Sequence, residues 1–545
     1  MTWVVDSEPS RRFPIYTRGN VGEVFPTVVT PLTGTLYVPQ AELGFRDAFA
    51  AFGALRRDEL GDEAMVMLGV FNGYAYLNAS FVRVLAVRTP GLTVADMDRQ
   101  FFGESEAPPY VARSGDKNVA ASMRIARILL ATLNTKALPD LDADKARVAA
   151  WLQALPDPAT ADDAALIGVL RAFRQEFRSL FGRHILTTFR ATIGPGLLAQ
   201  ICEGKLGDAT LPNKLLAGIG SVESAAPSAA MWDLSRLAPD TDAYRDAFAS
   251  FLAAFGSRGP NEWEGSSATW GTNPDLARAA IDRMRDADES HAPLAQQARL
   301  ESERHDATAK ARARLRGITR LQFDRALRSA QVFSQGRERS KTTIIKALHG
   351  VRLAQLELAR RARERGGPDE LADFWLLADA ELEDYLASPA GFTDTITARK
   401  TQREELNALV PPFVFESEQP PPATWARRDA AVGAAEKGAV LTGIAGCPGV
   451  ARGRARIVLD PGDPRGIGPG EVLVAPITDP SWTPLFVPAE AVVVEVGAQM
   501  SHAVIVSREL GIPAVVSVTG ATQLLRDGSL VEVDGNRGIV TVVEP

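Results

Sequence analysis

The chain contains few cysteines and no long hydrophobic run, and each of these features excludes some classes of protein. Its 545 residues include two cysteines, Cys202 and Cys447, which allow no disulfide framework and are typical of a reducing compartment. No stretch of about 18 consecutive apolar residues is present, and the N-terminus lacks the basic-then-apolar layout of a signal peptide. We therefore expect a cytoplasmic protein that does not cross a membrane.

The sequence also lacks the basic excess of most nucleic-acid-binding proteins. Its formal net charge is −7 and its pI about 5.6, so little positive charge is available to neutralise phosphates, and nucleic acid is not an expected partner. Hydrophobic residues make up 46% of the chain, which is typical of a globular protein. The length predicts roughly two to four domains.

Residues 1–410 are predicted to form a large, mainly helical domain with a small β element. Two apolar runs flank Asn72-Gly73, a strong signal for a β-hairpin. From about residue 118 onward, apolar residues recur at intervals of three and four, which indicates helices. Residues 275–365 are highly charged with a helical pattern, and a solvated helix face is the favoured interpretation of that charge.

Two further parts follow, and together the three predict a multidomain α+β protein. Residues 411–437, punctuated by Pro411-Pro412 and by three prolines at 420–422, are predicted to be a linker that spans roughly 25–30 Å if flexible. Residues 438–545 are β-rich and predict a compact α/β domain. Its expected strands lie at 453–459, 472–475, 491–494, 514–518, 530–533 and 538–543.

One histidine of that last domain stands where phosphate chemistry is favoured. A buried strand and a turn with Gly497 lead to Ser501, which occupies the N-cap position of a helix that begins at His502 and stops at Gly511. A helix N-terminus attracts anions, and a neutral imidazole can carry a covalent intermediate. By position alone, however, a histidine at a helix start is more often a cap or a surface residue.

The surrounding motifs resemble those of the swivelling phosphohistidine domain of phosphoenolpyruvate-utilising enzymes. Residues 495–513 resemble the active-site motif of that family, GGxxSHAAIVARELGIPAV, with Ala498 in place of its second glycine. The resemblance implies that His502 is the phosphorylated residue, with Gly497 and Ser501 positioning the phosphate. Arg508 is expected either near the phosphate or paired with a carboxylate. Three other segments are similar to the family's entry motif, loop and closing hairpin: 443–453, 478–486 and 531–535.

The first domain resembles the substrate-binding domain of rifampin phosphotransferase. The similar segments, in the same order, are 17–23, 31–33, 74–78, 255–262 and 270–274, with Ser257 where related sequences often carry His or Met. The resemblance implies two groups of substrate-binding residues, one polar and one aromatic: Arg18, Glu23, Arg258 and Glu262, then Phe71 and Tyr74. Ordinary loop ion pairs and a plain apolar core are the alternative interpretations of these two groups.

The resemblance implies a phosphotransferase component of the dikinase type. The family's ATP-grasp domain and pyruvate-binding barrel have no counterpart in the sequence, nor is there a GxxxxGK[ST] phosphate loop. We expect a separate ATP-grasp subunit, carrying ATP and Mg²⁺, to phosphorylate His502 with release of AMP and phosphate. His502 then gives the phosphoryl group to a hydroxyl of a small organic acceptor.

We expect this chain alone to bind no cofactor, and no metal either, because its histidines lack metal-ligand spacing. One alternative is a non-catalytic phosphohistidine carrier or a regulatory or scaffold subunit, which a degenerate site would favour. A stand-alone kinase with its own ATP site is the least favoured possibility.

Overall fold

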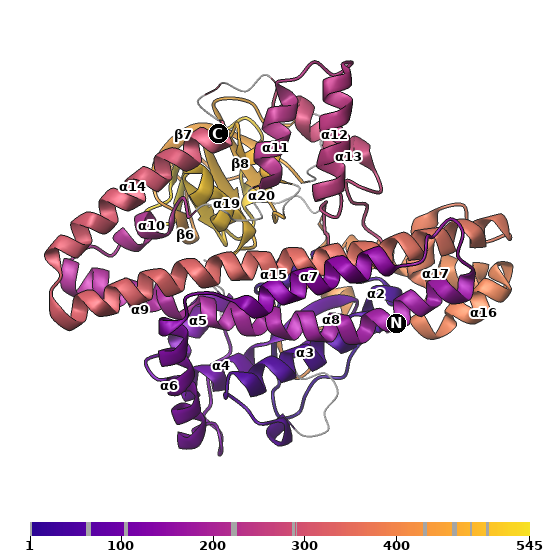
Figure 1. The fold of residues 1–545 in the computed structure, drawn as a ribbon, viewed down its shortest axis with the longest axis horizontal. Coiled ribbons are helices and arrows are strands. Elements are labelled where there is room, and N and C mark those ends of the chain that lie inside the picture. The colour runs from indigo at the N-terminus through magenta and orange to yellow at the C-terminus, as the bar shows by residue number, and fades with distance from the viewer. Residues whose placement is uncertain are drawn as a thin grey trace.

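The chain forms a mainly helical body with a small sheet, followed by a C-terminal body built around a larger sheet (Figure 1). This agrees with the predicted combination of a helical first part and an α/β last part. The computed structural model describes residues 3–60, 67–102, 107–219, 226–285, 289, 292–428, 433–459, 466–479, 482–497 and 501–545. Within these ranges, none of the helices has both the length and the apolarity that crossing a bilayer requires.

A 48-residue helix, α15 (Gly317–Glu364), runs through the middle of the molecule (Figure 1). It packs against α8 (Asp163–Ala191), and α7 (Pro139–Ala154) also lies alongside it. Neighbours approach closely at its small residues: a Cβ atom on Gly336 would lie 2.3 Å from Leu138, and one on Gly350 would lie 2.5 Å from Leu152. About half of α15 is buried, so it is a central element of the fold.

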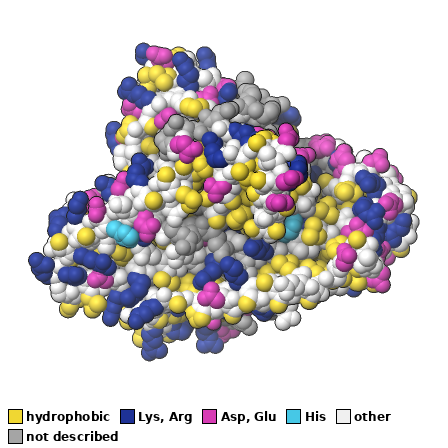
Figure 2. Space-filling model, turned by 45° about the horizontal axis from the view of Figure 1, so that its top comes forward, with side chains coloured by type: hydrophobic (Ala, Val, Ile, Leu, Met, Phe, Trp, Pro, Cys, Tyr) yellow, Lys and Arg dark blue, Asp and Glu magenta, His cyan; other side chains and the backbone are white. Residues whose placement is uncertain are grey.

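The expectation that residues 275–365 present a solvated charged face is therefore wrong for most of α15. It holds at the junction with α14 (Pro293–Arg314), where Arg312, Arg316 and Arg320 are exposed. Figure 2 shows basic side chains gathered at this end of the molecule. Sequence pattern could not separate the two cases, because an arginine-rich helix can pair its charges inside a protein as well as on its surface.

The remaining helices of the first body surround α15 and the small sheet. Their bounds are α1 (Val21–Val24), α2 (Pro31–Leu36), α3 (Val38–Ala51), α4 (Ala79–Arg88), α5 (Val94–Phe102), α6 (Val119–Asn134), α9 (Ile193–Ile201), α10 (Leu211–Leu216), α11 (Ala226–Ser235), α12 (Asp242–Phe255), α13 (Pro274–Arg283), α16 (Leu382–Ala387) and α17 (Thr393–Asn407). Helix α8 is capped by the Asp162 carboxylate, which accepts a hydrogen bond of 2.7 Å from the Ala165 amide. Helix α12 is followed by Gly256 as its C-cap.

The small sheet contains the predicted hairpin. Strands β2 (Leu68–Phe71) and β3 (Tyr74–Asn78) are antiparallel. Between them, Asn72 and Gly73 both have positive φ angles, 44° and 82°, which matches the turn that asparagine followed by glycine favours. Strand β1 (Ile15–Thr17) lies next to β3 and completes this part of the sheet.

The fourth strand of this sheet lies inside the predicted linker. Strand β4 (Val414–Glu416) pairs with β1, and the buried ring of Phe415 stacks on Tyr16 at 5.3 Å between centroids. The start of residues 411–437 is therefore anchored to the first body, which corrects the prediction that the whole segment is a linker. Residues 429–432 lie outside the described residues.

The C-terminal sheet has eight strands in the order β5-β12-β11-β7-β8-β9-β10-β6. Their bounds are β5 (Val440–Thr442), β6 (Ile444–Cys447), β7 (Val450–Ile457), β8 (Glu471–Ala475), β9 (Ala491–Val494), β10 (Ala514–Val516), β11 (Leu530–Asp534) and β12 (Ile539–Glu544). The four strands from β7 to β10 are parallel to one another. All six predicted strands are present, whereas β5 and β6 were not predicted as strands.

The central strands of this sheet are covered on both faces. Along β9, Val492 and Val494 belong to one apolar cluster, while Ala491 and Val493 belong to another on the opposite face. The first cluster also includes apolar side chains of α11, α12 and α13. The C-terminal sheet is thus packed against helices of the first body, which brings helix α19 (His502–Leu510) towards α15.

Candidate active site

His502 lies in the first turn of α19, where the local sequence places it. The Ser501 hydroxyl caps the helix by accepting a hydrogen bond of 3.4 Å from the Val504 amide. At the other end, Gly511 adopts the left-handed conformation with φ 67°, which permits the chain to turn into β10. Ser501 and Gly511 thus define both ends of a short helix that presents the imidazole at its N-terminus.

Two threonine hydroxyls hold the imidazole ring. Nδ1 of His502 lies 3.3 Å from Thr478 Oγ1, and Nε2 lies 3.3 Å from Thr483 Oγ1. The Phe486 ring meets the imidazole edge-on, at 5.9 Å between centroids. A hydroxyl can donate or accept, so these contacts suit a neutral ring with one protonated nitrogen. The ring is therefore oriented by its own domain before any partner acts on it.

The other side of the site belongs to the first body and is positively charged. Burial lowers the pKa of His502 well below its usual value, and the charges of Lys341, Arg258 and Arg337 lower it further. Two of these cations come from α15, and Arg258 follows the end of α12. At neutral pH the imidazole is consequently uncharged and retains a nitrogen lone pair, the form that can act as a nucleophile.

A single buried carboxylate organises two of the three cations. Glu262 is 1% exposed; its Oε2 accepts a hydrogen bond of 2.8 Å from Arg258 Nε, and its Oε1 lies 3.1 Å from Lys341 Nζ. Arg337 pairs with Glu338 instead, at 3.1 Å. Because one carboxylate serves two cations, positive charge remains in excess beside His502. A phosphoryl group on the ring would supply the missing negative charge.

One hydrogen-bond donor of Arg258 has no acceptor among the described residues. Its Nη1 lies 3.3 Å from the Thr342 hydroxyl, but its buried Nη2 has no hydrogen-bond partner among the residues that the structure describes. A buried polar group without a partner is costly, and sites that bind ligands are one place where it is tolerated. The spare donor is suited to a phosphoryl oxygen on His502.

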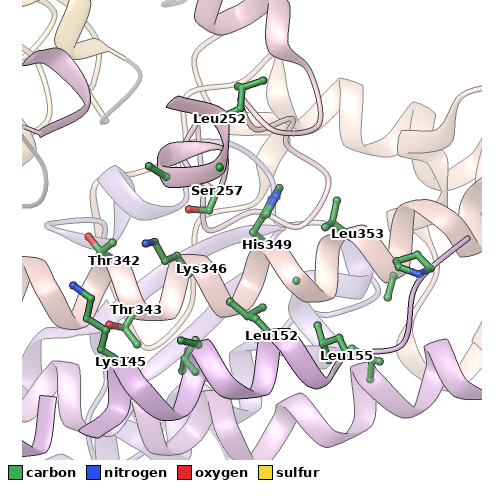
Figure 3. A pocket seen from close by; sticks show the side chains of 18 of the residues that line it. Lys145, Leu152, Leu155, Leu252, Ser257, Thr342, Thr343, Lys346, His349 and Leu353 are labelled. Atoms are coloured by element: carbon green, nitrogen blue, oxygen red, sulfur yellow. The ribbon is translucent and has the colours of Figure 1, made fainter. Parts of the chain in front are cut away.

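A cavity of about 550 Å³ opens next to this charged site (Figure 3). Side chains from α7, α12 and α15 line it, most of them apolar. Ser257 and Thr342 also line it, and each is the immediate neighbour of a cation of the site, Arg258 or Lys341. The size and the mixture of apolar walls with a few polar groups are typical of a small-molecule pocket.

Backbone and side-chain contacts hold the His502 domain against the first body. The Asn261 amide donates a hydrogen bond of 2.6 Å to the Asp479 carboxylate, next to Thr478. On the opposite side, a Cβ atom on Gly22 would lie 3.6 Å from Val496 Cγ1, so α1 packs against the loop before His502. The contact between Asn261 and Asp479 thus joins the segment after Arg258 to the loop whose Thr478 contacts the His502 ring.

Two sequence profiles match separate parts of the chain. Residues 467–538 match the PEP-utilising enzyme, mobile domain, and residues 183–338 match the rifampicin phosphotransferase fourth domain. His502 lies in the first match, and Arg258 and Arg337 lie in the second. Residues 467–538 are thus similar to the mobile domain of phosphoenolpyruvate-utilising enzymes, and residues 183–338 to the fourth domain of rifampicin phosphotransferase.

Individual relatives agree with this assignment. A rifampicin phosphotransferase of Bacillus subtilis is 29% identical over 308 residues, which cover 55% of this chain and 34% of that protein. The prodigiosin synthesizing transferase PigC of Serratia marcescens is 31% identical over 315 residues, or 56% of this chain and 34% of its own. An uncharacterized protein of Mycobacterium tuberculosis is 28% identical over 581 residues, which cover 99% of this chain and 62% of that relative. The chain therefore spans less than two thirds of the relatives it matches.

The residues proposed from sequence lie in two places. His502, Ser501, Arg258 and Glu262 come together at the site described above. Arg508 donates a hydrogen bond of 3.0 Å to the backbone oxygen of Gly446; among the described residues no carboxylate pairs with it, and it is not among the cations that act on His502. Gly497 precedes the site, and its carbonyl accepts a hydrogen bond from Ser517; Ala498 lies outside the described residues.

The aromatic candidates lie in the small sheet of the first body. Phe71 and Tyr74 are buried in its core, and Arg18 lies over the Tyr74 ring at 4.8 Å while its Nη2 donates to the carbonyl of Phe25. None of these three lines the cavity of Figure 3. Glu23 belongs to α1, the helix that packs against the loop before His502.

Sequence reasoning missed Lys341, Arg337, Thr478 and Thr483 as site residues. Lys341 and Arg337 are four residues apart, which places them on one face of α15, but many arginine and glutamate pairs of this helix share that spacing. The two threonines lie in a segment that resembles the family's loop, yet nothing in their pattern indicates contact with His502. Among the described residues no group of three or more His, Cys, Asp or Glu side chains is arranged to hold a metal ion.

Proposed function

We propose that this chain is a phosphotransferase component that carries a phosphoryl group on His502 to a hydroxyl of a small organic acceptor held in the cavity. The single observation that supports the proposal is that Arg258 and Lys341, whose neighbours Ser257 and Thr342 line the cavity, are close enough for their charges to act on His502. The relatives named as rifampicin phosphotransferases support a phosphotransferase kind of function.

The transfer step needs positioning and charge neutralisation. The acceptor oxygen attacks phosphorus in line, the bond between phosphorus and the ring nitrogen breaks, and the electron pair of that bond returns to the nitrogen. The proton leaving the acceptor hydroxyl ends on the imidazole, which is again neutral. Arg258 Nη2 and Lys341 are placed to neutralise the phosphoryl oxygens during the step.

The phosphoryl group is supplied, in this proposal, by a separate ATP-grasp subunit that holds ATP and Mg²⁺. In this proposal the His502 domain moves away from the first body for loading and returns to it for the transfer. Once phosphorylated, the negatively charged ring is attracted back to the three cations, which favours the docked state over the free one.

Phosphoramidate, a small phosphoryl donor, tests the carrier role without any partner. We expect the full chain to gain one acid-labile phosphate, and the His502→Ala variant to gain none. His305→Ala is the matched control, since His305 is an exposed histidine with a side chain 68% accessible, and its loss should change nothing. Acid-labile phosphate that persists in His502→Ala would overturn the proposal.

Addition of ATP and a candidate ATP-grasp protein, followed by a panel of hydroxyl compounds, tests the transfer. Loss of phosphate from His502 together with formation of an acid-stable phosphate ester is the expected result. A loaded chain that passes its phosphate to another protein and to no small hydroxyl compound would instead identify a non-catalytic carrier.

A further inference from the structure

The cavity of Figure 3 changes in character along its length. At the end near Ser257 and Thr342 it adjoins the cations that face His502. At the other end of the cavity the labelled lining side chains of Leu152, Leu155 and Leu353 are apolar. A molecule that fills the cavity therefore meets a polar region at the transfer site and an apolar region beyond it.

Lys346 introduces a charge between these two regions. It lines the cavity from α15 and is half-buried. Neither a hydrogen bond nor an ion pair connects it to any residue that the structure describes. At 1.5 Å per residue, Lys346 lies about 7.5 Å farther along the helix axis than Lys341, and it shares a helix face with Thr342. The ammonium group is consequently inside a mostly apolar cavity without a protein counter-charge.

The other ionisable groups of the cavity do not supply that counter-charge. Asp157 also lines the cavity, but it belongs to the turn just after Leu155, at the far apolar end. Lys145 on α7 adds a second positive group near Thr343 (Figure 3). His349 is uncharged, since burial and the charge of Arg352 lower its pKa to about 4. Of the lining residues, none therefore places a carboxylate beside Lys346.

Ser257 provides a further unsatisfied group at the transfer end. Its side chain is 6% exposed, and its Oγ has no hydrogen-bond partner among the described residues. It lies directly before Arg258 in the sequence and lines the cavity. A hydroxyl of the occupant placed here would satisfy Ser257 and would stand beside the cations that face His502.

We propose that the acceptor is an amphipathic hydroxy acid. Its hydroxyl lies at Ser257 beside the transfer site, its carboxylate pairs with Lys346, and its apolar body extends towards Leu353. The inference rests on the proposed function only in that this hydroxyl is taken as the group that accepts the phosphoryl group from His502. A carboxylate matches the half-buried ammonium group of Lys346, because charge-assisted hydrogen bonds are stronger than those between neutral groups.

Binding to the unphosphorylated chain tests the proposal separately from phosphoryl transfer. The probes are 3-hydroxydecanoate, 12-hydroxydodecanoate and 3-(4-hydroxyphenyl)propanoate, each compared with its own methyl ester by isothermal titration calorimetry. We expect at least one acid to bind at least tenfold more tightly than its ester. The Lys346→Met variant should bind that acid about tenfold more weakly and its ester unchanged, whereas Lys346→Arg should keep the preference for the acid.

Two controls accompany these titrations. Glu544→Ala, at an exposed strand end, should bind the same acid as well as the wild type does; since the chain carries no phosphate in these titrations, a failure of the phosphohistidine mechanism would leave the binding result standing. Circular dichroism of Lys346→Met should match the wild type, which excludes a folding defect. Equal affinity for acid and ester, a preference that Lys346→Met retains, or no binding by any of the three acids would each overturn the proposal.

Discussion

The Asn261 amide and the Asp479 carboxylate form a 2.6 Å hydrogen bond that joins the first body to the domain of His502. Asn261 has a positive φ of 47°, which is uncommon outside glycine and is tolerated by asparagine. Asp479 directly follows Thr478, whose hydroxyl contacts the His502 ring. The contact thus connects domain docking to the position of the imidazole.

Replacement of Asp479 by Ala should slow transfer without slowing loading. The variant leaves the Asn261 amide without its acceptor and weakens docking by about 1–3 kcal/mol, which corresponds to roughly a 5- to 150-fold loss of the docked state. Phosphate release from loaded His502 to the acceptor should fall accordingly, whereas loading by phosphoramidate should be as fast or faster. Glu544→Ala, at an exposed strand end, is the control. Equal transfer rates in wild type and Asp479→Ala would show that this contact plays no part in docking.

Lys341→Met tests whether this cation serves the reaction or only the fold. We expect transfer to fall about 10²- to 10³-fold, as is typical when one donor to developing negative charge is removed. The variant should also melt at a lower temperature, because buried Glu262 loses one of its two cations. Adding Glu262→Gln leaves buried Arg258 without its counter-charge, so it should lower the stability further and should not restore the transfer. Recovery of transfer in the double variant would indicate a purely structural role.

The titration of His502 should report on the neighbouring cations. Its pKa is lowered in the docked state, so the docked state binds fewer protons than a free histidine domain does. Docking is therefore fully favourable above the ordinary histidine pKa of about 6.5 and weakens as the pH falls from there towards the lowered value. Nitrogen-15 NMR of the imidazoles should show a neutral His502 at pH 6.

The same NMR measurement on Lys341→Met should show a higher pKa for His502 than in the wild type. His349 is the internal control, because its pKa of about 4 is set by burial and Arg352 and should not respond. An unchanged His502 pKa in the variant would mean that Lys341 does not act on the ring in solution.

Glu509 should make stability decrease with rising pH. Burial raises the pKa of its carboxyl to about 7 from 4.5, although the Ile219 amide and Arg304 oppose the shift. The folded state then holds a proton that the unfolded state has lost, so stability is greatest below pH 4.5 and falls until about pH 7. Glu509→Gln should remove this dependence and stabilise the protein by up to about 3 kcal/mol at pH 8.

Thermal unfolding of Glu509→Gln and wild type between pH 4.5 and pH 8 measures this difference. Glu544→Gln is a control for the loss of an exposed carboxylate. If the two melting curves keep a constant separation across the pH range, Glu509 does not titrate in it.

Local sequence predicted several elements correctly because local forces form them. Asn72-Gly73 predicted the hairpin, since few other dipeptides accept two positive φ angles. Ser501 and Gly511 predicted both ends of the helix that carries His502, because a side-chain cap and a left-handed stop act within one helical turn. Val492 and its neighbours predicted a buried strand from a short apolar run.

The features that the sequence did not predict depend on contacts between residues that lie far apart in the chain. Phe415 lies in a proline-rich segment with the composition of a linker, yet packing against Tyr16 makes it part of a strand. The charged pattern of α15 indicated a solvated face, yet much of the helix is buried among its neighbours. Neither outcome has a local signal, because each depends on which partner the chain brings near.

The sequence by itself determined that His502 stands at a helix N-terminus within a domain similar to those that carry phosphohistidine. Ser501, the glycines and the flanking strands are enough for this, since they act over a few neighbouring residues. Only the tertiary structure decided that Arg258, Lys341 and Arg337 face that histidine and that a cavity with Lys346 in its wall lies beside them. Those groups come from distant parts of the chain, and burial, packing and charge bring them together only when the whole protein folds.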